Sequence, residues 1–147
     1  MSNLFRNKIG FNDDVSNWDT RNVVDMSRLF CHANRFNQPL ENWNVNKVTN
    51  MSWMFYNAIN FNQPLEQWDT SKVTSMCGMF NHASSFNRPL KHWNVGSVVC
   101  MLCMFSAASR FNQSLECWNV SNVTDMHRMF TNANSFNQCL DKWGRKL

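Results

Sequence analysis

Cysteine and histidine are the side chains here that could bind a metal or carry redox chemistry. Cys100 and Cys103 form a C-x-x-C pair, a spacing used by zinc sites and redox motifs, but no second pair stands at zinc-finger spacing. The six cysteines occupy six different positions of the repeat set out next, whereas a metal array or disulfide ladder built by repetition would reuse one. They are Cys31, Cys77, Cys100, Cys103, Cys117 and Cys139. We therefore expect scattered, reduced thiols and neither metal nor redox chemistry.

Other catalytic arrangements have no support in the chain. The four histidines fall at variable repeat positions, and no Ser-His-Asp or Cys-His arrangement follows from their placement. The four glycines are not clustered, which argues against a phosphate-binding loop, and the ten carboxylates include no isolated pair. The sequence predicts a protein that is not an enzyme, with no cofactor, no bound metal and no small-molecule substrate.

The dipeptide Phe-Asn recurs every 25 residues, and a tryptophan follows each copy seven positions later. The pairs begin at Phe11, Phe36, Phe61, Phe86, Phe111 and Phe136, and the tryptophans are Trp18, Trp43, Trp68, Trp93, Trp118 and Trp143. A fixed period of this length is typical of a solenoid, in which each unit covers the next. We predict a single repeat domain over 1–147, with partial units 1–10 and 136–147. The full units are 11–35, 36–60, 61–85, 86–110 and 111–135.

Apolar residues within each unit change their spacing partway along it. Val48, Met51, Met54, Phe55 and Ala58 lie at helical spacing, which predicts a short helix over roughly 48–57 and its equivalents. The preceding Phe-Asn-Gln-Pro-Leu stretch predicts a turn followed by a short strand, because proline cannot donate within a sheet. Strands stack about 4.8 Å apart and helices about 10 Å apart, so we expect a curved α/β coil with its helices on the convex side.

The repeated positions are better explained by structure than by binding. The Asn of each Phe-Asn could form a polar ladder for ligands, but an Asn at a tight corner can instead bond neighbouring backbone amides or stack on the next Asn. The Met and Phe positions could form a flexible binding surface, but their helical spacing predicts that these side chains lie in the core.

Charge is mild and spread over the chain. The formal net charge is +4. One repeat position would form an acidic strip interrupted by a lysine, if the units stack. It holds Ser16, Glu41, Glu66, Lys91, Glu116 and Asp141. Nucleic-acid-binding proteins usually gather basic residues on one stripe with exposed aromatics, so the pattern argues against a nucleic-acid partner.

The unit Phe-Asn-Gln-Pro-Leu-Glu-x-Trp-Asn-Val-x-x-Val-Thr-x-Met-x-x-Met-Phe-x-x-Ala resembles a known repeat. It is similar to the BspA-like, leucine-rich-repeat-related surface-protein family, also called DUF285, from about Phe5 to Trp143. The most specific stretch is Val-Thr-Asn-Met-Ser-Trp-Met-Phe, from Val48 to Phe55. The resemblance implies a leucine-rich-repeat-like, right-handed coil without catalytic residues. Members of that family occur in mycoplasmas, other bacteria, protists and large DNA viruses, and adhesion is the usual proposal for bacterial surface members.

Function is expected where the repeat varies. Trp53 and Tyr56 fall off the predicted core stripe, so they are candidate contact residues, although they could instead pack against a neighbouring helix. Arg28, His82 and Arg128 occupy similar variable positions. The leading hypothesis is a non-enzymatic scaffold that binds a partner protein, for example as an accessory part of a virus particle. The alternative is a surface-adhesion or carbohydrate-binding module.

The two ends of the chain and its location raise further expectations. Neither end carries a polar cap, so either the terminal segments fold over and suffice, or the ends stack on another copy or another protein. The chain shows no secretory signal and no apolar run long enough to span a membrane. We expect a protein in the cytoplasm or assembled into a particle, in preference to the cell surface.

Overall fold

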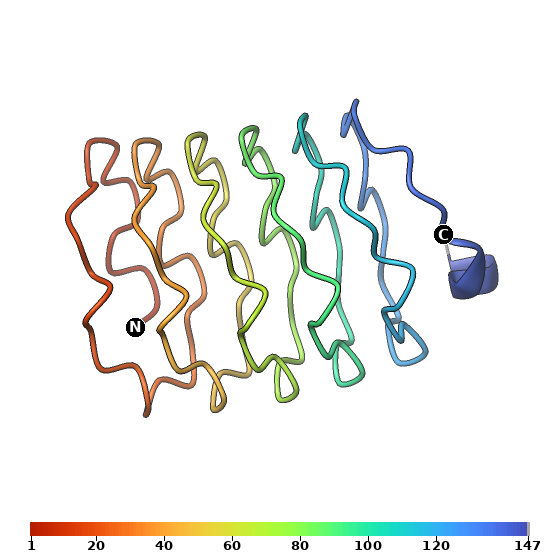
Figure 1. Cartoon of the computed structure of the whole chain (residues 1–147), viewed down its shortest axis with the longest axis horizontal. Helices are drawn as coiled ribbons and strands as arrows, with labels where there is room; N and C mark the ends of the chain where they lie inside the picture. The colour runs from red at the N-terminus through yellow and green to blue at the C-terminus, as the bar shows by residue number, and fades with distance from the viewer. Residues whose placement is uncertain (147) are drawn as a thin grey trace.

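The chain winds into a stack of coils, one for each 25-residue unit, running along the long axis of the molecule from the N-terminus to the C-terminus (Figure 1). The computed structural model describes residues 1–146. Backbone hydrogen bonds join residues about one unit apart: Met51 donates to the carbonyl of Ser75 at 3.0 Å, and Thr49 donates to the carbonyl of Val24 at 2.9 Å. Parallel bridges link successive coils at one repeat position, through Asp25, Asn50, Ser75, Cys100 and Asp125.

The predicted α/β solenoid, with one strand and one helix per unit, is wrong. Within residues 1–146 the single helix is η1 (Asp141–Lys146), a 3-10 helix at the C-terminal end. No extended β-strand forms in that range, where the parallel contacts are isolated bridges. The stretch predicted as a helix over 48–57 consists of consecutive turns instead.

Backbone hydrogen bonding explains why these turns replace a helix. Met54 and Tyr56 donate to carbonyls three residues earlier in their own coil, at 3.2 Å each. The intervening Trp53 and Phe55 donate to the next coil instead, at 2.8 and 2.9 Å. A left-handed backbone conformation closes two of the turns, with φ of 60° at Trp53 and 56° at Asn57. Backbone amides therefore donate in turn to their own coil and to the next coil. Every amide from 51 to 58 already has an acceptor, so the hydrogen bonds of a helix do not form.

The spacing between coils also excludes packed helices. The rings of Phe55 and Phe80, equivalent residues in adjacent coils, have centroids 5.6 Å apart. Helices packed side by side need about 8–10 Å between axes. The predicted curvature, which rested on helices lining one side, therefore loses its physical basis, and with it the leucine-rich-repeat-like description of the unit.

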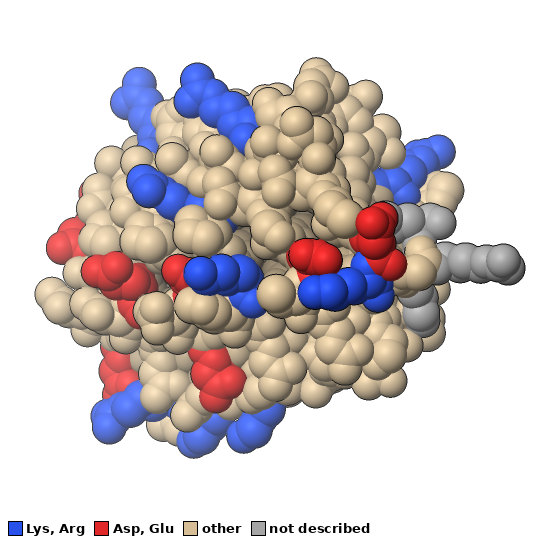
Figure 2. Space-filling model, turned by 45° about the vertical axis from the view of Figure 1, so that its right-hand side comes forward, with Lys and Arg blue, Asp and Glu red and all other residues tan. Residues whose placement is uncertain are grey.

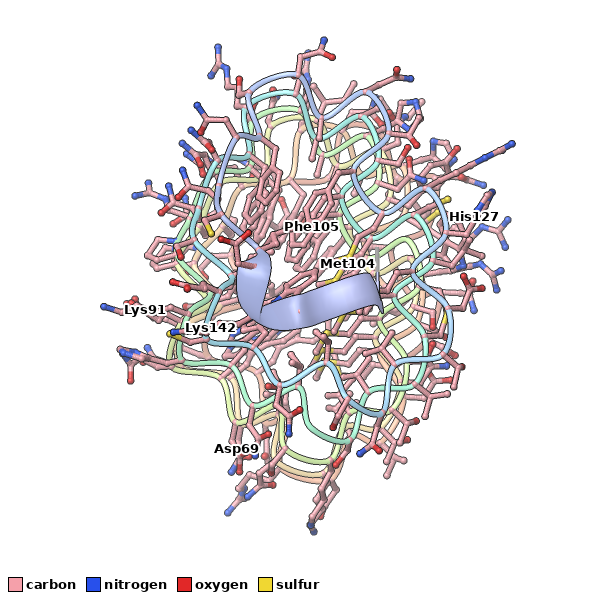
Figure 3. All side chains as sticks on the ribbon, turned by 90° about the vertical axis from the view of Figure 1, so that its right-hand side faces the viewer. Asp69, Lys91, Met104, Phe105, His127 and Lys142 are labelled. Carbon is pink, nitrogen blue, oxygen red and sulfur yellow. A yellow bond between two sulfur atoms is a disulfide. The ribbon has the colours of Figure 1, made fainter. Side chains whose placement is uncertain are left out.

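The core positions predicted from the repeat are confirmed. The Phe, Met, Val, Leu and Ala positions of the central units are buried in one continuous core, and Met104 and Phe105 point into it when the stack is viewed along its axis (Figure 3). Two phenylalanines of each coil lie against one another, as in Phe80 and Phe86 with centroids 4.0 Å apart. Each such pair stacks on the pair of the next coil, so aromatic columns run the length of the molecule.

Each repeated tryptophan after the first ties its coil to the previous one. The indole Nε1–H of Trp93 donates to the backbone carbonyl of Leu65 at 2.8 Å, and the same bond recurs at the other four. This bond satisfies the polar edge of a buried ring, which explains why tryptophan rather than phenylalanine occupies the position. Trp18 has no coil before it at this position, and 41% of its surface is exposed.

The prediction that the repeated asparagine bonds neighbouring backbone amides is confirmed. The side-chain oxygen of Asn62 accepts from the backbone N–H of Asn87 at 3.0 Å, and equivalent bonds run from Asn12 to Asn137. These residues therefore form a structural ladder at one edge of the coils. Among the described residues no helix is long and apolar enough to cross a membrane.

Candidate functional site, an aromatic cluster across three coils

Trp53 and Tyr56 lie together on the surface of the turn-rich side of the stack. Their ring centroids are 5.4 Å apart and the rings meet edge to face. Both side chains are half-buried. The predicted alternative, packing against a neighbouring helix, does not apply because this side of the stack contains turns.

A glycine in the next coil makes room for the Trp53 ring. Gly78 occupies the repeat position of Trp53, and a Cβ built on it would lie 2.1 Å from Cε3 of Trp53. Gly78 also has a left-handed backbone, with φ of 58°. The indole therefore lies flat over the backbone of its neighbour, a position that any larger side chain at 78 would block.

Two histidines complete the cluster from the adjacent coils. Tyr56 contacts His32 on one side and His82 on the other, with ring centroids 4.8 and 5.9 Å apart and nearly perpendicular planes. We call Trp53, Tyr56, His32 and His82 the aromatic cluster.

Asparagine side chains orient both imidazoles. Nδ1 of His32 lies 3.0 Å from the side-chain amide nitrogen of Asn57. The Asn57 side chain donates, so Nδ1 of His32 accepts the hydrogen bond. Nδ1 of His82 contacts the side-chain oxygen of the buried Asn81, which calls for the opposite tautomer. The cluster is thus an apolar platform with polar edges whose rings are held by fixed neighbours.

The predicted contact residues are only partly brought together. Trp53, Tyr56 and His82 meet in the cluster, and Arg28 lies one coil away at the repeat position of Trp53, exposed to solvent. Arg128 shares that position but lies three coils beyond Trp53, near the C-terminal end. It is therefore separate from the cluster.

Sequence reasoning did not select His32, Asn57 or Gly78 as site residues. His32 shares its repeat position with His82, two units apart, and Tyr56 bridges that distance. Gly78 carried a usable signal, because a glycine stands there where the other units have larger side chains.

The expectation of reduced thiols is wrong for one pair. Cys77 and Cys100 form a disulfide between adjacent coils, with Cα atoms 5.5 Å apart. The preceding coil has Ser52 and Ser75 at the equivalent positions, and their hydroxyl oxygens lie 2.7 Å apart. The pairing joins two different repeat positions, which explains why a search for one repeated cysteine position missed it. Cys31, Cys103, Cys117 and Cys139 are free thiols.

The described part of the chain offers no candidate metal site. Within residues 1–146 no group of three His, Cys, Asp or Glu side chains could hold a metal ion.

Burial raises the pKa of the Cys31 thiol, with Arg6 and Arg28 opposing that shift.

The predicted acidic strip has basic side chains from adjacent coils beside it. Glu66 lies 3.2 Å from Nδ1 of His92, and Glu116 lies 3.4 Å from Nζ of Lys142. Figure 2 shows acidic and basic side chains close together along one side of the stack. Lys142 points away from the stack on the side opposite His127, which belongs to the turn-rich side that carries the aromatic cluster (Figure 3).

Comparison with known proteins identifies one family. The model of the family described as "Mycoplasma protein of unknown function, DUF285" matches residues 1–75 and 62–146. No curated protein and no solved structure was found to match the chain. Because the two matched segments together cover nearly all of the stack described above, the chain belongs to the DUF285 family of repeat proteins.

Proposed function

We propose that this chain is a non-enzymatic interaction scaffold that binds a partner protein on the aromatic cluster. The observation that carries the proposal is the seating of Trp53 over Gly78, edge to face with Tyr56. Trp and Tyr are the residues most enriched at protein interfaces, where large, pre-positioned rings bury apolar area at little entropic cost.

The stacked coils support this function by holding the cluster rigidly. Trp53 and Asn57 donate backbone hydrogen bonds to the next coil at 2.8 Å, and His32 donates to Tyr56 at 2.7 Å. Their relative positions are therefore set by the inter-coil ladder rather than by a mobile loop. A pre-organised surface of this kind loses little freedom on binding.

A comparative pull-down tests the proposal. The wild-type chain, Trp53→Ala and Tyr56→Ala are immobilised and exposed to lysate of the source cells, and retained proteins are quantified by mass spectrometry. Lys91→Ala is the matched control, because Lys91 is exposed on the opposite side of the stack (Figure 3).

The proposal requires a specific protein retained by the wild type and the Lys91→Ala variant and lost from both cluster variants. The same proteins on all four baits, or no specific protein on any, would contradict it.

A carbohydrate-binding or adhesive role is the second candidate. The half-exposed Trp53 ring favours it, because it lies against Tyr56, which in turn contacts His32 and His82, and sugars stack on aromatic rings and hydrogen-bond to nearby polar groups. A glycan array probed with the wild type and Trp53→Ala distinguishes the candidates. Glycan binding that depends on Trp53 would support this role, and an array without signal would remove it.

The setting in which we place the scaffold is a large assembly such as a virus particle. The Cys77–Cys100 disulfide supports an oxidising location of the kind found on virion and cell surfaces, which keeps the adhesive alternative open. The small basic excess and the Glu116–Lys142 ion pair on one side favour a protein partner over nucleic acid.

A further inference from the structure

The C-terminal end of the stack presents a row of unpaired backbone donors. In every earlier coil the amides equivalent to Arg128, Phe130 and Asn132 donate to the following coil, as Cys103 does to His127 at 3.0 Å. Within residues 1–146 the amides of Arg128, Phe130 and Asn132 have no acceptor. A row of unpaired groups at such an edge is a template for pairing with another chain.

Space is available along this edge. A hollow of about 660 Å³ is lined by 124–131, the segment that carries the amides of Arg128 and Phe130 and ends just before Asn132. Seen along the axis, η1 crosses the middle of the end face, while His127 lies at its rim (Figure 3). The amides of this edge therefore remain accessible beside η1.

The N-terminal end presents the complementary acceptors. Asn3, Phe5 and Asn7 donate to the first full coil at 3.0, 2.9 and 2.7 Å. The carbonyls between them, those of Ser2, Leu4 and Arg6, occupy positions that accept from the preceding coil everywhere else, and within the described residues they accept no hydrogen bond.

The backbones of the two ends match in register. Asn3 and Asn7 have φ of 60° and 62°, and Arg128 and Asn132, at the same repeat positions, have φ of 56° and 59°. Successive coils pair with such positions aligned, so the segment 2–7 has the shape of the coil that would follow 126–132. Aligning them puts the amides of Arg128, Phe130 and Asn132 opposite the carbonyls of Ser2, Leu4 and Arg6.

Side chains of the two ends are also complementary. Phe5 stacks on Phe30 with centroids 5.5 Å apart, and Phe105 stacks on Phe130 at 5.8 Å, so each terminal ring has a neighbour on one side. Phe5 and Phe130 are half-buried, whereas Phe105 is fully buried. Placing Phe5 of one copy on Phe130 of another would continue the aromatic column.

We propose that a second copy of the chain docks head to tail, pairing its segment 2–7 with the open edge 126–132. This contact uses two different surfaces and continues the stack along its own long axis, so it adds copies into filaments. It involves the end of the stack rather than the aromatic cluster, so it is independent of the partner proposed above.

Site-directed disulfide trapping tests the arrangement. Ser2 and His127 occupy the same repeat position, both are exposed, and the docked copies would place their Cα atoms about 5 Å apart, within reach of a disulfide. Separately purified Ser2→Cys and His127→Cys variants are mixed under mild oxidation, and linked peptides are mapped by mass spectrometry to distinguish them from products of native thiols. Ser2→Cys mixed with Lys91→Cys is the control.

The expected result is a 2–127 linkage in large excess over the 2–91 linkage. Sedimentation of the wild type should also show mass rising with concentration, and Leu4→Glu should abolish the rise by placing a charge in the contact. Leu4 is 51% exposed in the free chain, so this variant should keep its fold.

Equal amounts of the two linkages would overturn the proposal, as would a wild-type chain that remains a monomer at all concentrations. Predominant 2–2 linkage would overturn it as well, because it indicates a closed symmetric dimer.

Discussion

At the scale of single residues, the repeated tryptophan combines a buried ring with a hydrogen bond across coils. Trp93 is buried and its Nε1–H bonds the carbonyl of Leu65, whereas Trp18 is 41% exposed and has no earlier coil to bond. The two tryptophans should therefore contribute differently to the stability of the same chain. This contrast supplies a matched pair for measurement.

Trp93→Phe should lower the free energy of unfolding by roughly 1–2 kcal/mol, because it removes the cross-coil hydrogen bond and part of the buried ring. Trp18→Phe should change it by less than about 0.5 kcal/mol, as for most surface substitutions. Urea denaturation of both variants measures the difference. Equal losses would show that the cross-coil bond contributes nothing.

Gly78 controls the position of Trp53, and Gly78→Ala should displace the indole because its Cβ would fall 2.1 Å from the ring. The shift should be visible as a moved indole N–H resonance, assigned by its loss in Trp53→Phe. Gly96→Ala is the control, since a Cβ there would approach only side-chain atoms of Asn94 and Asn119, at 3.2 and 4.0 Å. An unmoved Trp53 resonance in Gly78→Ala would mean that the ring is not seated on the glycine.

Asp69 occupies a position where three other coils have Asn44, Asn94 and Asn119. Its pKa is lowered because the side chain and backbone N–H of Ser71 both hydrogen-bond its carboxylate. A lowered folded-state pKa stabilises the fold above the unfolded pKa, near 3.8, and this contribution is lost as the pH falls through the folded pKa.

Asp69→Asn should therefore weaken the acid dependence of stability while leaving the fold intact at neutral pH, because Asn44 and Asn94 accept the same bond in adjacent coils. Denaturation at a series of pH values down to about pH 2 measures this. Identical pH profiles for wild type and variant would contradict it.

At the scale of elements, the turns explain both what the sequence predicted and where it failed. Met51, Met54, Phe55 and Ala58 are buried as predicted, because consecutive turns return a chain to the core at intervals of three or four residues, as a helix does. The apolar spacing alone could not separate the two structures. The deciding quantity is the 5.6 Å spacing of the Phe55 and Phe80 rings, which belongs to packing between coils.

The candidate site, too, was predictable from the sequence only in part. Trp53, Tyr56 and His82 were identifiable because they break the repeat, and the structure brings them together. The role of His32 depends on which residues of adjacent coils align, and the Cys77–Cys100 pairing depends on a cross-coil contact between two different repeat positions. Neither alignment can be derived from the spacing within one unit.

The disulfide should stabilise the two coils that it joins. Its cysteines are 23 residues apart, a separation for which loss of the cross-link costs about 3 kcal/mol by the chain-entropy estimate. The double variant Cys77→Ser/Cys100→Ser should lose most of this amount, offset in part by a hydroxyl pair like that of Ser52 and Ser75. Thermal unfolding with and without reductant is the measurement. A reductant effect that persists in the double variant would exclude this pair as its source.

At the scale of the whole molecule, the stack behaves as a series of equivalent units, each contacting its neighbours. Every coil after the first repeats the Asn ladder and the Trp bond to its neighbour, so no unit depends on a distant one. Removing a complete unit should therefore shorten the molecule without destroying it.

Deletion of 111–135 should give a folded chain that is less stable and about 5 Å shorter in solution scattering, because one coil is lost and the repeat register is kept. Deletion of 112–135 removes one residue fewer and shifts the register, so core side chains would face solvent and the chain should fail to fold. Equal behaviour of the two deletions would contradict this modular description.

The alternating amide bonds of each coil have a consequence for exchange with heavy water. The amide of Phe80 can be exposed when its coil separates from the next, whereas the amide of Met79 is freed when its own turn opens. Neighbouring residues thus report two different openings of the molecule. Deuterium uptake should alternate along each coil, and the amides bonded between coils should lose protection first at the two ends and last in the middle.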